Sequence, residues 1–230
     1  MEKLLAEKSK MSLVERFGKV IISPSKAFAD IAQQPRILWP GLIIIVLNLA
    51  LTLLIMSETK VFTEQTMVAS GANQAQIDLA MKFVLPGAIG GTILILPLSW
   101  LVIAAILALY NQFSVGEARF KQLYAVTVFA GIPAVIKTVI TTGLIKTMGF
   151  KAALQVSTSL AIVWENADSA SFLYRLMERI ELFNIWGLIL LIMGGSIAMQ
   201  KKARGLALFM GGIWLIYVVV MALLVKTPVV

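Results

Sequence analysis

Lys137 is the residue of this sequence whose position most clearly calls for a chemical explanation. It is the one charged residue deep within a long apolar run, 123–145, and ionisable side chains inside a membrane mark ligand contacts, ion pathways or buried ion pairs. Glu178 and Glu181 stand just before another apolar run. We favour a structural pair between Lys137 and Glu181, with contact to a lipid headgroup or other ligand second and a translocation site third.

Other candidate residues have simpler explanations. Asn48, in the middle of the first apolar run, is expected to form an interhelical hydrogen bond. All the carboxylates lie outside the apolar runs, which argues against a proton-coupled pump, since such pumps usually keep an acidic residue within the membrane. The chain has no histidine and no cysteine, which removes common metal ligands and the base of serine hydrolases. We expect no enzymatic activity, no cofactor and no metal site.

Five long apolar runs must position these residues. The chain of 230 residues is 59% hydrophobic and 14% charged, whereas soluble proteins are about 45–50% apolar. Each run approaches or exceeds the ~20 residues that a helix needs to cross a bilayer. We therefore predict an all-α polytopic membrane bundle with five transmembrane helices, at residues 37–56, 83–110, 123–145, 183–199 and 206–225.

Prolines and glycines within the runs predict irregular and tightly packed helices. Pro97 and Pro133 each lie inside a span, and proline in a helix interior produces a kink. Small residues let neighbouring helices approach closely. We predict such close packing at Gly87, Gly91, Gly194, Gly195, Gly211 and Gly212.

Residues 1–36 form a basic amphipathic segment, predicted to be cytoplasmic. Leu13, Val14, Phe17, Val20 and Ile21 follow helical spacing on one face, with Arg16 mostly on the other side. Ser23-Pro24 predicts the start of a second short helix. These interfacial helices either lie on the membrane surface or pack on the cytoplasmic end of the bundle, and both arrangements are compatible.

The remaining segments connect the spans. Gly71 and Asn73 divide the loop at 57–82 into two short helical pieces. Residues 146–182 are predicted to be extracytoplasmic, and within them 152–164 is too short to cross, so an interfacial or re-entrant helix is expected. Glu165–Ser171 reads as a polar loop. Ser171 is expected to cap a helix that continues unbroken into the fourth span. Residues 37–227 thus form one transmembrane domain.

The distribution of basic residues predicts the orientation. Segments on the side of the N-terminus carry more lysine and arginine than the segments on the other side, which places the N-terminus inside and the C-terminus outside. The net charge is +8. Because the basic residues flank the spans, membrane lipids with anionic headgroups are the expected partners, and nucleic acid is not.

Several short stretches occur in a familiar order: Pro24 and Phe28 before the first span, Gly116–Gln122 before the third, Ala130–Pro133 inside it, and Glu181–Trp186 at the start of the fourth. Together they resemble the bacterial branch of the Yip family of Ypt/Rab-interacting membrane proteins, over about residues 16–225. That family has five spans and a cytoplasmic N-terminus. Its eukaryotic members act with Rab GTPases through longer N-terminal regions, so the 36 residues here argue against GTPase binding.

The resemblance implies a multi-pass protein of the bacterial inner (cytoplasmic) membrane. Some bacterial members accompany ABC-type exporters that have a permease and an adaptor subunit and that defend against toxic peptides. The expected function is therefore that of a non-enzymatic accessory or assembly subunit, in transport linked to antimicrobial peptide resistance. The alternative is a small transporter or lipid-handling protein, which would need a water-lined cavity that reaches Lys137.

Overall fold

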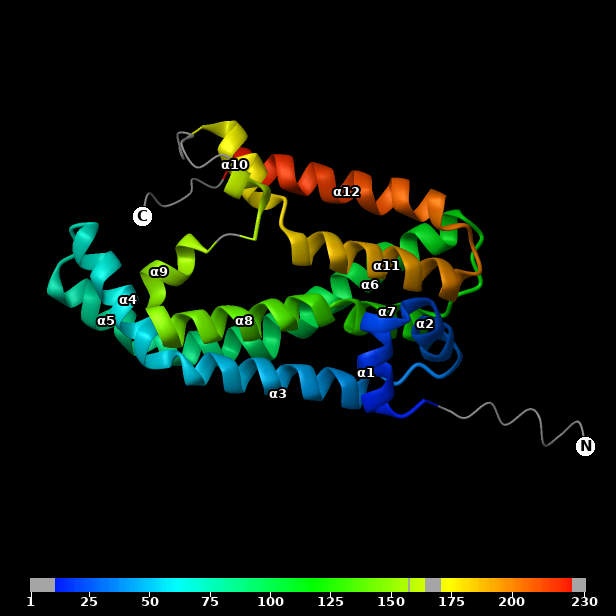
Figure 1. Cartoon of the computed structure of the whole chain (residues 1–230), viewed down its shortest axis with the longest axis horizontal. Coiled ribbons are helices and arrows are strands. Elements are labelled where there is room, and N and C mark those ends of the chain that lie inside the picture. The colour runs from blue at the N-terminus through cyan, green and yellow to red at the C-terminus, as the bar shows by residue number, and fades with distance from the viewer. Residues whose placement is uncertain (1–10, 157, 164–170, 225–230) are drawn as a thin grey trace, which may run out of the picture. The chain divides into compact units, whose positions relative to one another are not determined.

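The computed structural model describes residues 11–156, 158–163 and 171–224, and these residues are helical almost throughout (Figure 1). No β-strand occurs among them, as predicted for an all-α protein. The helices are α1 Leu13–Ile22, α2 Pro24–Gln33, α3 Leu38–Leu54, α4 Met56–Ala69, α5 Gln74–Gly90, the π-helical turn η2 Gly91–Ile95, α6 Leu96–Phe113, α7 Phe120–Ala130, α8 Ile132–Met148, α9 Phe150–Gln155, the 3₁₀ turn η3 Leu160–Val163, α10 Phe172–Arg179, α11 Leu182–Met199 and α12 Ala203–Leu224.

The number of candidate membrane spans is four or five. Among the described residues, four helical segments are long and apolar enough to cross a membrane, at Gln74–Phe113, Phe120–Met148, Leu182–Met199 and Ala203–Leu224. A fifth crossing results if α3 and α4, which are bent by 60° at Ile55, count as one broken span. The first predicted span therefore differs from the others, because α3 alone has 17 residues.

The chain divides into two compact units. The first contains Met1–Gly41, Trp100–Ile132 and Trp186–Trp214, and the second contains Leu42–Ser99, Pro133–Ile185 and Leu215–Val230. The boundaries fall within α3, α6, α8, α11 and α12. Each of these helices thus contributes residues to both cores.

In the first unit, α1 and α2 form a helical pair that packs on α7. The Ser12 hydroxyl accepts a hydrogen bond from the backbone N–H of Glu15 (3.2 Å) and caps α1. Pro24 begins α2 after Ser23, as the sequence predicts. Phe28 of α2 and Phe129 of α7 are fully buried. One side of the amphipathic segment therefore packs against the protein's own helices.

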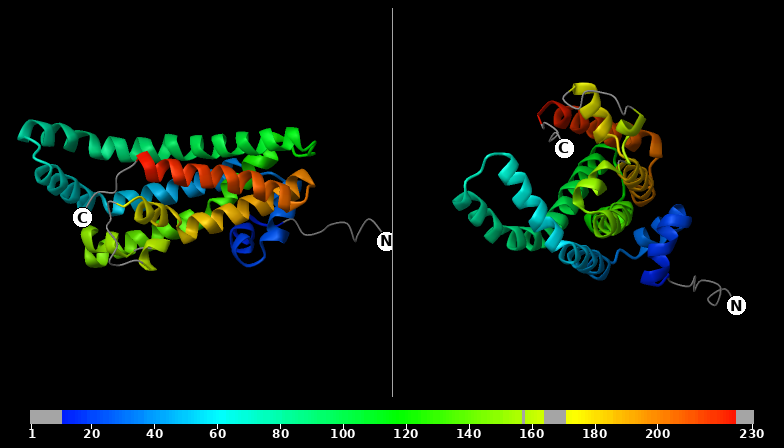
Figure 2. Two further views of the ribbon diagram at one scale, coloured as in Figure 1. Left: turned by 90° about the horizontal axis from the view of Figure 1, so that it is seen from above. Right: turned by 60° about the vertical axis from the view of Figure 1, so that its left-hand side comes forward.

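In the second unit, α4 and α5 form the helical hairpin drawn in cyan tones in Figure 2. Gly71 makes the turn with a φ of +80°, a conformation that favours glycine. Asn73 and Gln76 then cap α5 reciprocally through bonds of 3.0 and 2.9 Å. The predicted division at Gly71 and Asn73 is confirmed, but the second piece continues directly into the helix that includes η2 and α6.

Two predictions for the segment before the fourth span are wrong. The helix from Ser171 stops at Arg179, and Ile180 and Glu181 separate it from α11. Residues 152–163 form no single helix, because α9 ends at Gln155 and Ser159 pairs in a β-bridge just before η3. Both differences have the same cause. Ser159 and Glu181 form an isolated antiparallel bridge, and such a bridge requires extended backbone at each of the two residues. The predicted polar loop at 165–171 lies outside the described residues, except for Ser171 itself. Val225, the predicted end of the fifth span, also lies outside them.

The two prolines predicted to kink their spans lie beside local irregularities. The π-helical turn Gly91–Ile95 directly precedes the α-helical turn that contains Pro97. Such a turn redistributes the backbone hydrogen bonds that a proline interrupts. Pro133 is the second residue of α8, just after the break at Gly131 that ends α7.

The glycines fall into two groups. A Cβ added to Gly194 would lie 2.6 Å from Phe28 Cδ1, and one added to Gly195 would lie 2.8 Å from Leu206 Cδ2, so both lie at close contacts. At the other four, no neighbouring helix of this chain packs closely, because they have open space or only their own helix beside them: Gly87, Gly91, Gly211 and Gly212.

Candidate functional site

Glu181 is a buried carboxylate at the start of α11, with its side chain 6% exposed. Its Oε1 accepts hydrogen bonds from the Thr158 hydroxyl (2.7 Å) and from the N–H of Phe183 (3.3 Å). Its Oε2 accepts the N–H of Asn184 (3.2 Å). A carboxylate at a helix N-terminus satisfies otherwise unpaired N–H groups and is favoured by the helix dipole.

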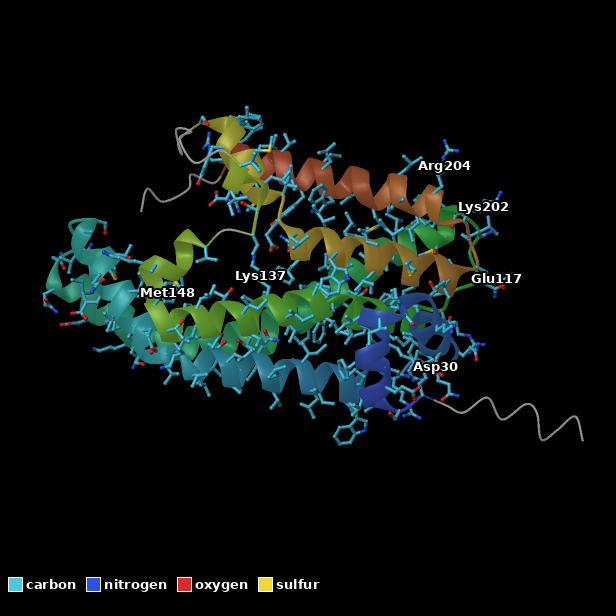
Figure 3. All side chains as sticks on the ribbon, viewed as in Figure 1. Asp30, Glu117, Lys137, Met148, Lys202 and Arg204 are labelled. Atoms are coloured by element: carbon cyan, nitrogen blue, oxygen red, sulfur yellow. The ribbon has the colours of Figure 1, made fainter. Side chains whose placement is uncertain are left out.

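Lys137 supplies the positive charge for this carboxylate. Its Nζ lies 3.3 Å from Glu181 Oε2, and its side chain, which projects from α8, is 44% exposed (Figure 3). The ion pair expected from the sequence is therefore present. Backbone bonds reinforce the junction, from Leu182 N to Thr158 O (3.2 Å) and from Leu160 N to Ile180 O (2.9 Å). All these groups belong to the second unit, where they join α8, α11 and the segment between them.

The other two candidates from the sequence, Asn48 and Glu178, lie on α3 and α10. Asn48 donates its side-chain amide to Ile44 O of its own helix (2.9 Å), so the predicted interhelical bond is wrong. Glu178 lies in α10, whose last residue is Arg179, and is half-buried. Because the chain is extended at Ile180 and Glu181, the two glutamates do not share one continuous helix face.

A second buried charge was missed from the sequence. Arg16 is 0% exposed, its Nε lies 2.7 Å from Asp30 Oδ2, and its Nη1 donates to Gln34 O (2.9 Å). The sequence reading placed Arg16 on the polar side of α1, which is wrong. Arg16 lies four residues before the buried Val20, and residues four apart share a helix face, so this spacing in the sequence indicated a buried Arg16. The guanidinium is buried because a carboxylate and a carbonyl at the end of α2 both compensate its charge.

The short loop between α6 and α7 explains a stretch that carried the family resemblance. Gly116 N donates to Asn111 O (2.7 Å), and the Asn111 side chain bonds Ala118 at both its N–H and its carbonyl. A Cβ at Gly116 would lie 2.2 Å from Asn111 Oδ1, so only glycine fits there. Gln122 accepts the N–H of Arg119 (2.6 Å) and donates to Ala32 O of α2 (2.7 Å). The motif therefore fixes the loop and the position of α2.

The second unit also has an open pocket of about 560 Å³ between α4 and residues 148–152. The rings of Phe62 and Phe150 stack there with centroids 4.5 Å apart. The Lys146 ammonium, 2.5 Å from Glu58 Oε1, and the Ser57 hydroxyl lower the pKa of the Glu58 carboxyl from 4.5 to about 2. This carboxylate is therefore ionised at all physiological pH values, which suits an ion pair rather than proton transfer.

The buried charged groups are thus engaged in holding segments together. Among the described residues, no group of three or more histidine, cysteine, aspartate or glutamate residues is arranged to hold a metal ion. Glu181 and Arg16 each have protein partners for their charge. The arrangement can orient helices, and the apolar surface suits contact with membrane lipids.

The comparisons with known proteins identify the family. The family model of the Yip1 domain matches residues 18–224, whereas no curated protein and no solved structure matches the chain. The matched range includes the Gly116–Gln122 loop, the α7–α8 break and the Glu181 cap, so the features described above lie within it. With its several apolar helices, this multi-pass integral membrane protein belongs to the Yip1 domain family.

Proposed function

We propose that this protein is a non-enzymatic accessory or assembly subunit of a membrane complex in the bacterial cytoplasmic membrane, with its N-terminus inside and its C-terminus outside. The complex that fits the family resemblance is an ABC-type exporter involved in resistance to toxic peptides. Its permease and adaptor subunits are then the protein partners, and surrounding lipids are the other contacts.

The observation that carries this proposal is that the buried charged groups pair within the chain while much of the apolar helix surface is exposed. The buried carboxylate Glu181 and the buried guanidinium of Arg16 hold segments of the chain together. By contrast, only 17% of the most apolar window of Gln74–Phe113 is buried, against 50% for Phe120–Met148. The few buried charged groups hold segments together within an apolar core, and the apolar exterior is available for contact.

The glycines of α5 add a specific contact surface to this picture. An added Cβ at Gly87 or Gly90 would have no atom within 4 Å, so neither glycine serves packing inside the chain. In membranes, small residues on a helix face let a partner helix approach closely. Gln74–Phe113 therefore combines low burial with the side-chain pattern of a helix that packs against a partner.

Co-purification tests the proposal. The tagged chain, extracted from native membranes in mild detergent, should retain permease and adaptor subunits. Gly87→Leu should weaken that retention while leaving the chain folded, because Gly87 is exposed and an added Cβ has no atom within 4 Å. Leu98→Ala is the matched control, since Leu98 is 56% exposed on the same continuous helix. A chain that always purifies alone, with no transport defect on its deletion, contradicts the proposal.

The alternative of a small transporter or lipid-handling protein required a water-lined cavity at Lys137. The pocket between α4 and residues 148–152 and a second one along α4 have other lining residues. Lys137 instead contacts the carboxylate that caps α11. Lys137 thus has a structural partner, which supports the accessory role.

A further inference from the structure

Helix α1 has a second apolar face that points away from the helices on which α1 packs. Its packed side contains Arg16 and Val20, both 0% exposed, whereas Val14 and Ile22 are 82% exposed and Ile21 is 44% exposed. Positions 14, 18, 21 and 22 share one side of a helix. Gly18, between them, has no atom within 4 Å of an added Cβ. We call Val14, Ile21 and Ile22 the outer strip of α1.

Chain connectivity and Trp39 indicate the depth of this strip relative to the membrane. Helix α2 ends at Gln33 and α3 begins at Leu38, and the four residues between them span at most about 14 Å. Trp39, in the first turn of α3, is 60% exposed, and exposed tryptophan at the start of a span favours the headgroup region. Because α1 packs on α2, the outer strip is expected near the headgroup level of the leaflet where α3 begins.

The charges around the strip show which kind of surface covers it. Within the described part of the first unit, the acidic side chains are engaged: Glu15 by Lys19 (2.6 Å), Asp30 by Arg16 and Glu117 by Gln200 (2.8 Å). The exposed cations Lys26, Arg36, Arg119 and Lys121 form no ion pair with any carboxylate in this part of the chain. Exposed cations without an internal ion pair and an exposed apolar strip in the same unit together complement an anionic lipid surface.

We propose that the outer strip of α1 inserts into the boundary between headgroups and acyl chains of an anionic leaflet, while Lys26 and Arg36 contact its headgroups. Helix α1 then serves two surfaces at once, α2 and α7 on one side and lipid on the other. The ion pair of Arg16 with Asp30 and its hydrogen bond to Gln34 O hold α1 in place, so the strip is presented without the cost of folding a helix on the membrane.

Depth measurements on the full-length protein test this insertion. The natural chain has no cysteine, so Val14→Cys and Ile22→Cys each give one labelling site. After spin labelling in nanodiscs that contain phosphatidylglycerol, both labels should collide several-fold more with oxygen than with a water-soluble nickel chelate. Gln112→Cys, at an exposed position near the end of α6 in the same unit, is the control and should show the reverse. Labels at 14 and 22 that are as open to nickel as the Gln112→Cys label would overturn the proposal.

The same labels separate lipid from a protein occupant. A second copy or another protein on the strip would immobilise the labels and shield them from both reagents, which would also overturn the proposal. The charge component is tested with nanodiscs of phosphatidylcholine alone. Insertion should then be shallower. Lys26→Gln combined with Arg36→Gln should abolish the difference in insertion depth between the two lipid compositions. The control Lys82→Gln, in the second unit, should leave that difference intact. Equal depth in both lipids contradicts the anionic preference.

Discussion

Glu181 joins three segments of the second unit through one carboxylate. It accepts bonds from the Thr158 hydroxyl and from the N-terminus of α11, and it pairs with Lys137 of α8. A buried carboxylate with several donors is far more costly to remove than an exposed one. Glu181 is therefore the residue whose loss should most disturb this junction, and Lys137 is the more replaceable partner.

Removing each partner of this pair should have unequal effects. Glu181→Ala should lower the free energy of unfolding by about 2–4 kcal/mol, because buried N–H groups and the Lys137 charge lose their partner. Lys137→Met should cost only about 1 kcal/mol, since the side chain is 44% exposed. Unfolding by titration with denaturing detergent measures both.

Lys82→Met, at an exposed lysine of α5, controls for the loss of a surface charge and should be neutral. If Lys137→Met left the stability intact but abolished function, Lys137 would have a direct functional role.

The Glu58 carboxyl should titrate far below an ordinary glutamate. Its pKa falls from 4.5 to about 2 because Lys146 and Ser57 bind the charged form. A carboxyl whose folded-state pKa is lowered contributes stability above its unfolded pKa, and this contribution is lost as the pH falls from about 4.5 toward 2. Carboxyl ¹³C NMR should show the low value and its return upward in Lys146→Met. Lys151→Met, at another lysine of the same pocket, should not change it.

At the level of helices, the contact between α2 and α11 depends on the absence of a side chain at Gly194. Phe28 Cδ1 and Val126 Cγ1 would lie 2.6 and 2.7 Å from an added Cβ. Both neighbours are fully buried, so neither can move into open space. The glycine thus sets the distance between α11 and the amphipathic pair that packs on α7.

Gly194→Ala should therefore reduce the free energy of unfolding by about 1–3 kcal/mol through overpacking. Gly211→Ala is the matched control on α12, where an added Cβ meets nothing within 4 Å; it should be neutral or stabilising, because alanine favours helix. Thermal unfolding in detergent distinguishes the two. In a double-mutant cycle, Phe28→Ala combined with Gly194→Ala should cost less than the sum of the two separate losses, because the smaller side chain relieves the clash. Equal effects at Gly194 and Gly211 would contradict this packing.

For the whole molecule, composition and run length predicted the helical membrane protein, because both report the total apolar surface. The pairing of Lys137 with Glu181 was also predictable, since a charge inside an apolar run needs a partner nearby. The break at Ile180 was not, because it depends on a bridge to Ser159 that is distant in sequence. The burial of Arg16 depends likewise on Asp30 and Gln34. Local periodicity carries no information about such non-local partners.

The orientation of the whole chain is open to a direct test. We expect Gln33→Cys and Gln112→Cys to react with a membrane-impermeant maleimide only after cells are permeabilised, because the basic segments on their side favour the cytoplasm. Ser70→Cys and Gln76→Cys should react on intact cells. All four positions are exposed in the structure, so protection reports the membrane rather than burial. The reverse pattern would invert the topology.

The π-helical turn at Gly91–Ile95 has a consequence for comparing this chain with its relatives. Such a turn holds about one residue more than an α-helical turn. Residues after it are therefore rotated by about 100° from the positions that an uninterrupted helix would give them. A relative with a regular helix here would be one residue shorter and still present the same faces. Alignments of the family should thus place a single-residue gap inside this apparently continuous span, where insertions are otherwise least expected.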